Sequence, residues 1–176
     1  MKRRAFLQAS LGAAALWPAR FVLAGEAPLA DLNAKTLTGA GAILRGTEVR
    51  ELAEAMRGQV LVPGQGGYDQ ARRIWNGMFD RKPAFIARCA APSDVMHAVN
   101  FARQHQLLTA VRCGGHSASG KSTCDGGLMI DLSPMQSVRV DPKARTARVE
   151  GGALLGHLDR ETKTFGLVTT DRKSVV

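Results

Sequence analysis

Residues 111–131, VRCGGHSASGKSTCDGGLMID, combine glycines, small hydroxyl residues and one histidine in a single loop between two short apolar runs. Glycine has no Cβ, so the backbone at Gly114, Gly115 and Gly120 can adopt positive φ and approach a ligand within hydrogen-bonding distance. Successive N–H groups of such a loop point into one concavity, which binds a phosphate or pyrophosphate without side-chain charge. The pattern therefore predicts a nucleotide-binding loop.

One interpretation of this loop is a P-loop NTPase that uses Gly115 to Ser122, because these residues satisfy the pattern G-x-x-x-x-G-K-[ST]. A P-loop needs a helix that begins at the Lys-Ser pair, so that the positive end of the helix dipole faces the phosphates. Residues 123–127 are turn formers and cannot supply that helix, since a crossover with its helix needs at least about 10 residues. The NTPase is therefore the second hypothesis.

The other interpretation is a flavin-binding loop. The segment RCGGHS at 112–117 and the segment DGGLMIDLS at 125–133 resemble the PCMH-type FAD-binding domain of the vanillyl-alcohol oxidase and p-cresol methylhydroxylase family, and within it the berberine-bridge-like FAD-linked oxidases. The resemblance extends from about Asn76 to Thr170. It implies that the loop holds the FAD pyrophosphate and that His116 is bonded covalently to the 8-alpha carbon of the flavin. A neutral imidazole is a good nucleophile, which is compatible with this role.

The resemblance implies a site that holds FAD with consecutive loop residues. It also implies an enzyme that takes a hydride from an alcohol, sugar or similar carbon centre onto flavin, with dioxygen as the acceptor. A histidine in a polar loop is more often a solvated side chain, and a glycine pair is often only a turn. A noncatalytic exported domain is thus a third hypothesis. The expected cofactor-binding residues are Arg112, Cys113, Gly114, Gly115, His116, Ser117, Ala118, Ser119 and Gly120.

The elements that must aim this loop follow from hydrophobic spacing. Residues 83–89 and 107–111 predict buried strands, and residues 128–130 predict another strand directly after the loop. Between the first two strands, residues 94–105 predict a helix that Ser93 caps. Its expected buried face consists of Val95, Val99 and Ala102.

The flanking segments complete an α+β pattern. Residues 138–140 and 146–150 alternate around a turn and predict a hairpin, which residues 153–165 follow as a helix. That helix is expected to bury Leu154, Leu158 and Phe165. Before residue 76, the sequence predicts an irregular linker at 26–41, a helix at 48–56 that Thr47 caps and Gly58 ends, an apolar run at 60–62 and a short helix at 69–75.

The formal net charge of +9 comes partly from the first 24 residues, which carry Lys2, Arg3, Arg4 and Arg20 and no acidic residue. The remainder shows no basic run with interleaved aromatic residues, so nucleic acid is not an expected partner. The three cysteines and four histidines show no metal-binding spacing, although Cys113 and Cys124 could in principle form a disulfide.

Residues 1–24 are expected to be a twin-arginine signal peptide, because KRRAFLQ at 2–8 resembles that consensus and the apolar stretch at 9–16 is too short to span a bilayer. The mature protein would be periplasmic or secreted, with no stable membrane span. Residues 25–75 would form a linker with a packing helix, and residues 76–170 a partial FAD-binding domain.

The C-terminal residues 171–176, DRKSVV, resemble nothing in the family. A common short-read sequencing adapter encodes these residues, so we interpret them as an artefact. In the family, a second glycine-rich segment and a substrate domain with the catalytic base follow this point. We therefore expect no catalytic residue in this chain, weak FAD binding and no turnover by the chain alone.

Overall fold

The computed structural model describes residues 29–169, so the proposed signal peptide and the last six residues lie outside the described part. The element order is β1 (Leu32–Lys35), β2 (Gly41–Leu44), α1 (Gly46–Ala55), β3 (Gln59–Leu61), α2 (Tyr68–Ala71), β4 (Phe85–Arg88), α3 (Pro92–Gln104), β5 (Thr109–Arg112), β6 (Leu128–Asp131), β7 (Val138–Asp141), β8 (Thr146–Val149) and α4 (Leu155–Lys163).

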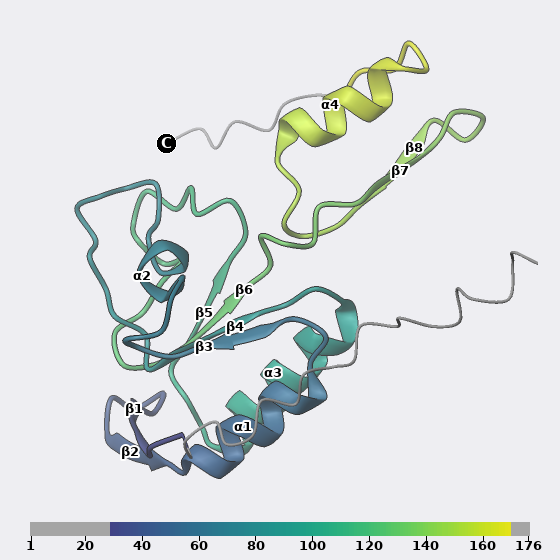
Figure 1. Cartoon of the computed structure of the whole chain (residues 1–176). Coiled ribbons are helices and arrows are strands. Elements are labelled where there is room, and N and C mark those ends of the chain that lie inside the picture. Colours follow the sequence, from purple (N-terminus) through teal and green to yellow (C-terminus); the bar gives the residue numbers. More distant parts are fainter. Residues whose placement is uncertain (1–28, 170–176) are drawn as a thin grey trace, which may run out of the picture.

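A four-stranded sheet in the order β3-β4-β6-β5 forms the centre of the fold (Figure 1). β4, β6 and β5 are parallel, and β3 is an antiparallel edge strand. The strands predicted at 83–89, 107–111 and 128–130 are confirmed. β6 pairs between β4 and β5, so the connection at residues 113–127 must return along the full length of a strand, and it does so without a helix.

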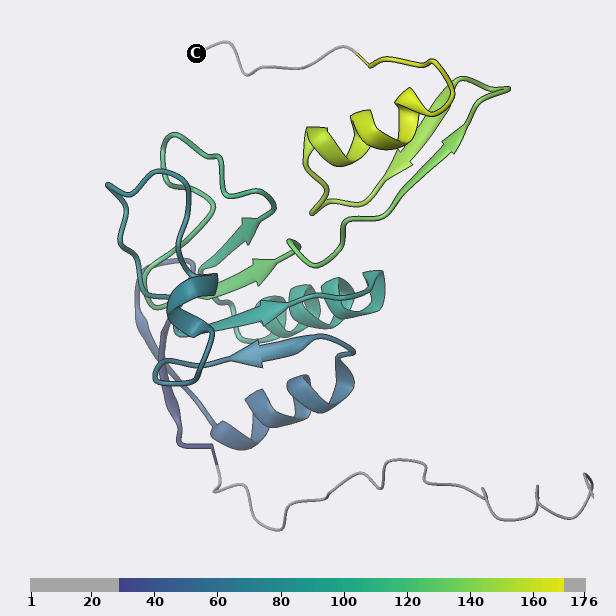
Figure 2. The same cartoon turned by 45° about the horizontal axis from the view of Figure 1, so that its top comes forward.

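The two faces of this sheet are covered differently (Figures 1 and 2). α1 and α3 pack on one face, where Phe85, Leu128 and Ile130 belong to the main core. On the other face, the short α2 packs over a smaller cluster that includes Ile86 and Met129. Because side chains alternate along a strand, the residues of β6 serve both cores in turn, and all four of them are buried.

α1 begins at Gly46, one residue before the predicted cap Thr47, and its N-cap is Arg45. The Asp31 side chain accepts a hydrogen bond from the Gly46 N–H at 2.9 Å, which replaces the predicted hydroxyl cap. The predicted stop at Gly58 has a packing reason: a Cβ there would lie 1.9 Å from the Arg88 carbonyl oxygen.

α3 also begins earlier than predicted, at Pro92, and its N-cap is Ala91 instead of Ser93. The predicted buried face is wrong at Val99, which is 49% exposed. Asp94 instead lies on the buried face, where its carboxylate accepts hydrogen bonds from the N–H groups of Arg57, Gly58 and Ala90. A buried charge is stable only when it is paired in this way, which hydrophobic spacing alone does not reveal.

Two N-terminal predictions are corrected. The segment predicted as a linker at 26–41 contains β1, which forms an antiparallel hairpin with β2. This hairpin joins the central fold because the Lys35 N–H donates to the Gly126 carbonyl at 2.7 Å. The helix predicted at 69–75 is only α2, which ends at Ala71. The short polar hairpin gave no periodic signal of its own.

The hairpin predicted after residue 137 is confirmed as β7 and β8, and α4 follows it. These three elements project beyond the end of β6 (Figure 2). The predicted burial of the α4 stripe is wrong, because Leu154 is 41% and Phe165 50% exposed. In the described residues, no helix is long and apolar enough to cross a membrane.

Candidate functional site

The glycine loop, residues 113–127, leaves β5 at the carboxyl edge of the parallel strands and returns to the amino edge before β6. Its C-terminal part is tied to that edge: the Gly126 N–H donates to the Lys82 carbonyl and the Ala84 N–H donates to the Gly127 carbonyl, both at 2.8 Å. The Asp125 carboxylate accepts from the Lys82 N–H at 2.8 Å. Only the N-terminal part of the loop is therefore free to form a ligand site.

Residues 75–81, which we call the clamp segment, hold the middle of the glycine loop. The Trp75 N–H donates to the Gly115 carbonyl at 3.1 Å, and the Asn76 side chain donates to the Ala118 carbonyl at 2.9 Å. The Arg81 guanidinium donates to the carbonyls of Gly120 and Thr123, both at 3.0 Å. The clamp segment thus binds carbonyl oxygens of the loop and leaves its N–H groups available.

The conformation of the loop depends on glycine at three of the predicted positions. Gly115 and Gly120 have φ of +71° and +69°, values that L side chains rarely adopt. A Cβ on Gly120 would also lie 2.5 Å from the Phe79 ring. A Cβ on Gly114 would lie 2.6 Å from Leu154, the residue before α4. These close approaches explain why small residues occupy this part of the loop.

Six consecutive backbone N–H groups, those of residues 114–119, donate none of the hydrogen bonds formed within the described residues. The next N–H groups are used: Gly120 donates to the Ser117 carbonyl at 3.1 Å and Lys121 to the Ser117 hydroxyl at 3.1 Å. Backbone N–H groups in a glycine-rich turn form a concavity that favours an anion. This row fits the pyrophosphate of a dinucleotide cofactor, as the sequence predicts.

Asp131 lies where β5 meets the loop, and its side chain is 1% exposed. Its two oxygens accept hydrogen bonds from Arg112 at 2.9 Å and from Arg88 at 3.2 Å. The Ser133 N–H also donates to this carboxylate at 3.0 Å. One guanidinium nitrogen of Arg112, a residue that is predicted to contact the cofactor, therefore donates to Asp131 at the start of the loop.

The remaining predicted residues lie along the same stretch. The side chain of His116 is exposed, next to the row of N–H groups, and Cys113 and Ser119 are also exposed. The Ser117 and Ser119 hydroxyls lie 3.3 Å apart. All nine predicted residues thus lie together. Phe79 and Arg81 also adjoin the loop, but their segment has no periodicity, so the sequence did not predict them as site residues.

The cysteines are free thiols and not a disulfide. Cys89 and Cys124 are buried, and burial raises the pKa of Cys89 to about 12 and that of Cys124 to about 11. Such thiols are inert packing groups at neutral pH. Among the described residues, no group of three His, Cys, Asp or Glu side chains could hold a metal ion.

The P-loop interpretation has no support in the structure. Lys121 and Ser122 lie in a turn, and the next regular element is β6, not a helix. The phosphate-facing helix N-terminus of a P-loop is therefore missing from this stretch.

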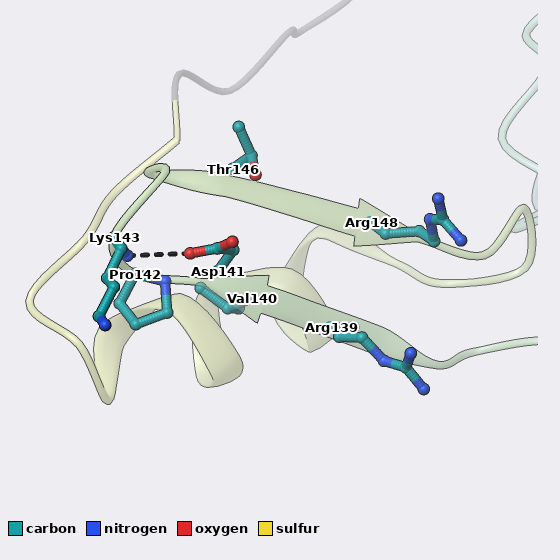
Figure 3. A pocket seen from close by; sticks show the side chains of 7 residues that line it. All are labelled: Arg139, Val140, Asp141, Pro142, Lys143, Thr146 and Arg148. Atoms are coloured by element: carbon teal, nitrogen blue, oxygen red, sulfur yellow. Dashed lines mark hydrogen bonds between the residues drawn. The ribbon is translucent and has the colours of Figure 1, made fainter.

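A hollow of about 570 Å³ lies on the β7–β8 hairpin, away from the glycine loop (Figure 3). Arg139 and Arg148 line it and face each other across the strands. The turn beside them is closed by Asp141, whose carboxylate accepts from the Lys143 N–H at 3.0 Å. The hollow is open and built of exposed side chains, so we assign no cofactor to it.

Comparison with known proteins places this geometry among flavoproteins. A family model described as an FAD binding domain matches residues 83–175. The (R)-6-hydroxynicotine oxidase of Paenarthrobacter nicotinovorans is 38% identical over 113 residues, which are 64% of this chain and 25% of that protein. An FAD-linked oxidoreductase of Dictyostelium discoideum is 41% identical over 120 residues, 68% of this chain and 26% of that protein. Berberine bridge enzyme-like 14 of Arabidopsis thaliana is 33% identical over 94 residues, 52% of this chain and 18% of that protein.

Solved structures agree with the sequence relatives. The 6-hydroxy-D-nicotine oxidase of Arthrobacter nicotinovorans superposes with a TM-score of 0.61 and 38% identity, over 63% of this chain and 24% of that one. A carbohydrate oxidase of Microdochium nivale gives a TM-score of 0.57 and 29% identity, over 64% of this chain and 24% of that one. The chain therefore spans about a quarter of the length of the relatives that it matches.

Proposed function

The chain belongs to the family of FAD binding domains, and we propose that it is the pyrophosphate-holding part of an enzyme that takes a hydride from an alcohol, sugar or similar carbon centre. Family membership confirms the predicted α+β, PCMH-type fold class, FAD as the cofactor and the FAD-linked oxidoreductase family, including its berberine bridge enzyme-like branch. The single observation that carries the proposal is the row of N–H groups at residues 114–119, which have no hydrogen-bond acceptor within the described residues.

The described residues of this chain would bind and orient the cofactor. FAD, when bound, would supply the redox chemistry, as the acceptor of the hydride and the donor of two electrons to dioxygen. The N–H groups at 114–119 would bind pyrophosphate oxygens, since oriented backbone dipoles stabilise an anion without a counter-charge. The clamp segment holds the same backbone from its carbonyl side. The loop can therefore receive the cofactor with little rearrangement, which reduces the entropy cost of binding.

We further propose that an imidazole nitrogen of His116 bonds to the 8-alpha carbon of the flavin, with loss of the imidazole N–H proton and of one proton from the 8-alpha methyl group. The two electrons released would reduce the flavin, which dioxygen would reoxidise. The exposed side chain lies within the row of N–H groups that would hold the cofactor. A covalent bond at this position would hold the ring system next to its own phosphate site. The other eight predicted residues, from Arg112 to Gly120, form the surrounding backbone cradle.

Relatives support the proposed substrate class only in general terms. The carbohydrate oxidase of Microdochium nivale supports a sugar, and the hydroxynicotine oxidase supports a carbon centre in another small molecule. Dioxygen as the acceptor agrees with the word oxidase in both names. Export by the twin-arginine route to the periplasm or the outside remains our proposal from the arginine pair at Arg3 and Arg4, because that route carries proteins already folded around a cofactor.

The test is acid precipitation of the full-length protein that carries this chain. We expect flavin absorbance to stay with the precipitate of the wild-type protein and of His97→Ala, a control at an exposed histidine on α3. The precipitate of His116→Ala should be colourless. Flavin released from the wild-type protein by acid would refute the covalent bond, and a purified protein without any flavin would refute the cofactor role. ATP hydrolysis that disappears in Lys121→Ala would instead support the hypothesis of a P-loop NTPase.

A further inference from the structure

We propose that Asp131 is a positioning residue for the cofactor cradle, acting through Arg112. This inference rests on the proposed function of the glycine loop. Asp131 ends β6, and it is in register with Arg88 of β4 and Arg112 of β5. Side chains in register on neighbouring strands lie on one face of a sheet, so the carboxylate lies between the two guanidinium groups at the carboxyl edge.

The two arginine partners of the Asp131 carboxylate differ in exposure. The Arg112 side chain is 18% exposed and the Arg88 side chain 37%. Arg112 is therefore the inner partner, and its ion pair at 2.9 Å is also the shorter one. Because the backbone oxygen of Arg112 accepts from the Leu132 N–H at 2.8 Å, both the backbone and the side chain of Arg112 are fixed from the end of β6.

The Arg112 guanidinium group connects the Asp131 carboxylate with the backbone of the loop. Its Nε atom is buried and has no hydrogen-bond partner within the described residues. The same atom lies 3.6 Å from the place that a Cβ on Gly115 would take. The guanidinium group thus packs against the turn at Gly115, the second residue of the row of N–H groups at 114–119. Moving the guanidinium would allow the backbone of Cys113 to Gly115 to move as well.

A buried carboxylate elsewhere in the chain provides a matched control. Asp94 is 0% exposed and, unlike Asp131, is held by three backbone N–H groups, those of Arg57, Gly58 and Ala90, next to α1 and α3. None of these partners belongs to the glycine loop or the clamp segment. Loss of either carboxylate should destabilise the fold, and only loss of Asp131 should change the loop at equal stability.

The experiment compares Asp131→Asn with Asp94→Asn in the full-length protein, at a temperature where circular dichroism shows both to be folded. Hydrogen exchange of the Trp75 and Leu132 N–H groups, which donate to the carbonyls of Gly115 and Arg112, should be faster in Asp131→Asn by about tenfold and unchanged in Asp94→Asn. Exchange is measured with both substitutions in a His116→Ala background, from which the flavin can be removed because it has no covalent bond. Bound flavin, from the ratio of visible to ultraviolet absorbance, should fall in Asp131→Asn on the order of tenfold, since small misplacements of a binding group have effects of this size or larger.

Equal loop exchange in the two variants, or wild-type flavin content in folded Asp131→Asn, would overturn the proposal. If Asp131→Asn does not fold, Arg88→Gln decides, because it removes the outer ion pair from a side chain that is already partly exposed. It should accelerate loop exchange by a smaller factor, and no acceleration would count against the proposal. A wild-type protein without flavin would refute the proposed function instead, and the exchange data would still test the positioning role.

Discussion

The glycine loop and the β7–β8 hairpin both leave the central sheet, but they are held in opposite ways. The loop is bound by groups distant in sequence: the clamp segment, Lys82 and the ion pair of Arg112 with Asp131. The hairpin is closed by its own turn, where the Asp141 carboxylate accepts from two N–H groups at 2.9 and 3.0 Å. Residues 141–149 are all exposed.

This difference indicates which region is organised to bind a small ligand. A loop that is fixed by its neighbours before binding loses little conformational entropy when the ligand arrives. The hairpin needs only local contacts, and its exposed Val149 and the nearby Leu155 leave apolar surface open. Substitutions in the two regions should therefore differ: the loop should depend on its distant partners, and the hairpin should be independent of them.

The largest expected effect is that of an added methyl group in the loop. Gly120→Ala should destabilise the protein by about 2–4 kcal/mol, because an L side chain is strained at φ of +69° and its Cβ would overlap the Phe79 ring. Gly156→Ala, its counterpart in α4, meets open space and should stabilise by about 0.5 kcal/mol. Urea unfolding of both variants measures the contrast.

Equal destabilisation by the two alanines would mean that the loop is no more constrained than α4. The proposed difference in constraint between the two regions would then be wrong. Flavin content should follow the same order, because the strained position lies directly after the row of N–H groups.

The second effect concerns the clamp. Arg81→Met should cost about 1–3 kcal/mol, because it leaves the carbonyls of Gly120 and Thr123 without their donor. Arg148→Met on β8 should change the stability by less than about 0.5 kcal/mol, since its side chain is exposed and forms no ion pair within the described residues. Thermal unfolding would detect the difference, and a loss in Arg148→Met as large as in Arg81→Met would show that the hairpin has distant partners too.

Much of this contrast could be predicted from the sequence. The apolar runs located β4, β5 and β6, the alternation located the β7–β8 hairpin, and the glycines together with His116 located the loop. These signals are local, because a strand or a turn is encoded by residues that are adjacent in the chain. The loop could therefore be assigned before its surroundings were known.

The support of the loop could not be predicted in the same way. The pairing of Arg112 with Asp131 requires the strand order, which places β6 between β4 and β5. The clamp segment has no periodic pattern, so nothing in the sequence indicated that Arg81 binds the loop. Hydrophobic spacing did not indicate that Asp94 is buried, where its carboxylate accepts from three backbone N–H groups. Tertiary contacts decide all three cases.

Acid should weaken the scaffold through Asp94. Burial alone would raise the pKa of Asp94, but hydrogen bonds from the N–H groups of Arg57, Ala90 and Gly58 outweigh it and lower the pKa in the folded state. The unfolded chain, with a pKa of about 3.9, therefore takes up this proton first. The stability is complete above that pH and falls as the pH drops toward the folded pKa.

The measurement is the urea midpoint at several pH values from neutral down to about pH 3. The midpoint of the wild-type protein should decline more steeply with acid than that of Asp94→Asn, which has no carboxyl group to protonate at this position. Parallel curves for the wild-type protein and Asp94→Asn would show that this carboxylate does not link pH to stability.

The smallest effect tests the hairpin by itself. Arg145 has φ of +54° in the turn before β8, a conformation that costs a non-glycine residue free energy. Arg145→Gly should relieve this strain of about 1–2 kcal/mol. Because glycine loses about 0.5–1 kcal/mol more conformational entropy on folding, the net stabilisation should be about 0.5 kcal/mol. Because the turn is exposed and its hydrogen bonds are local, the gain should leave the flavin content unchanged. A stabilised hairpin that also changed flavin binding would mean that the two regions communicate, and the independence inferred from their contacts would then be wrong.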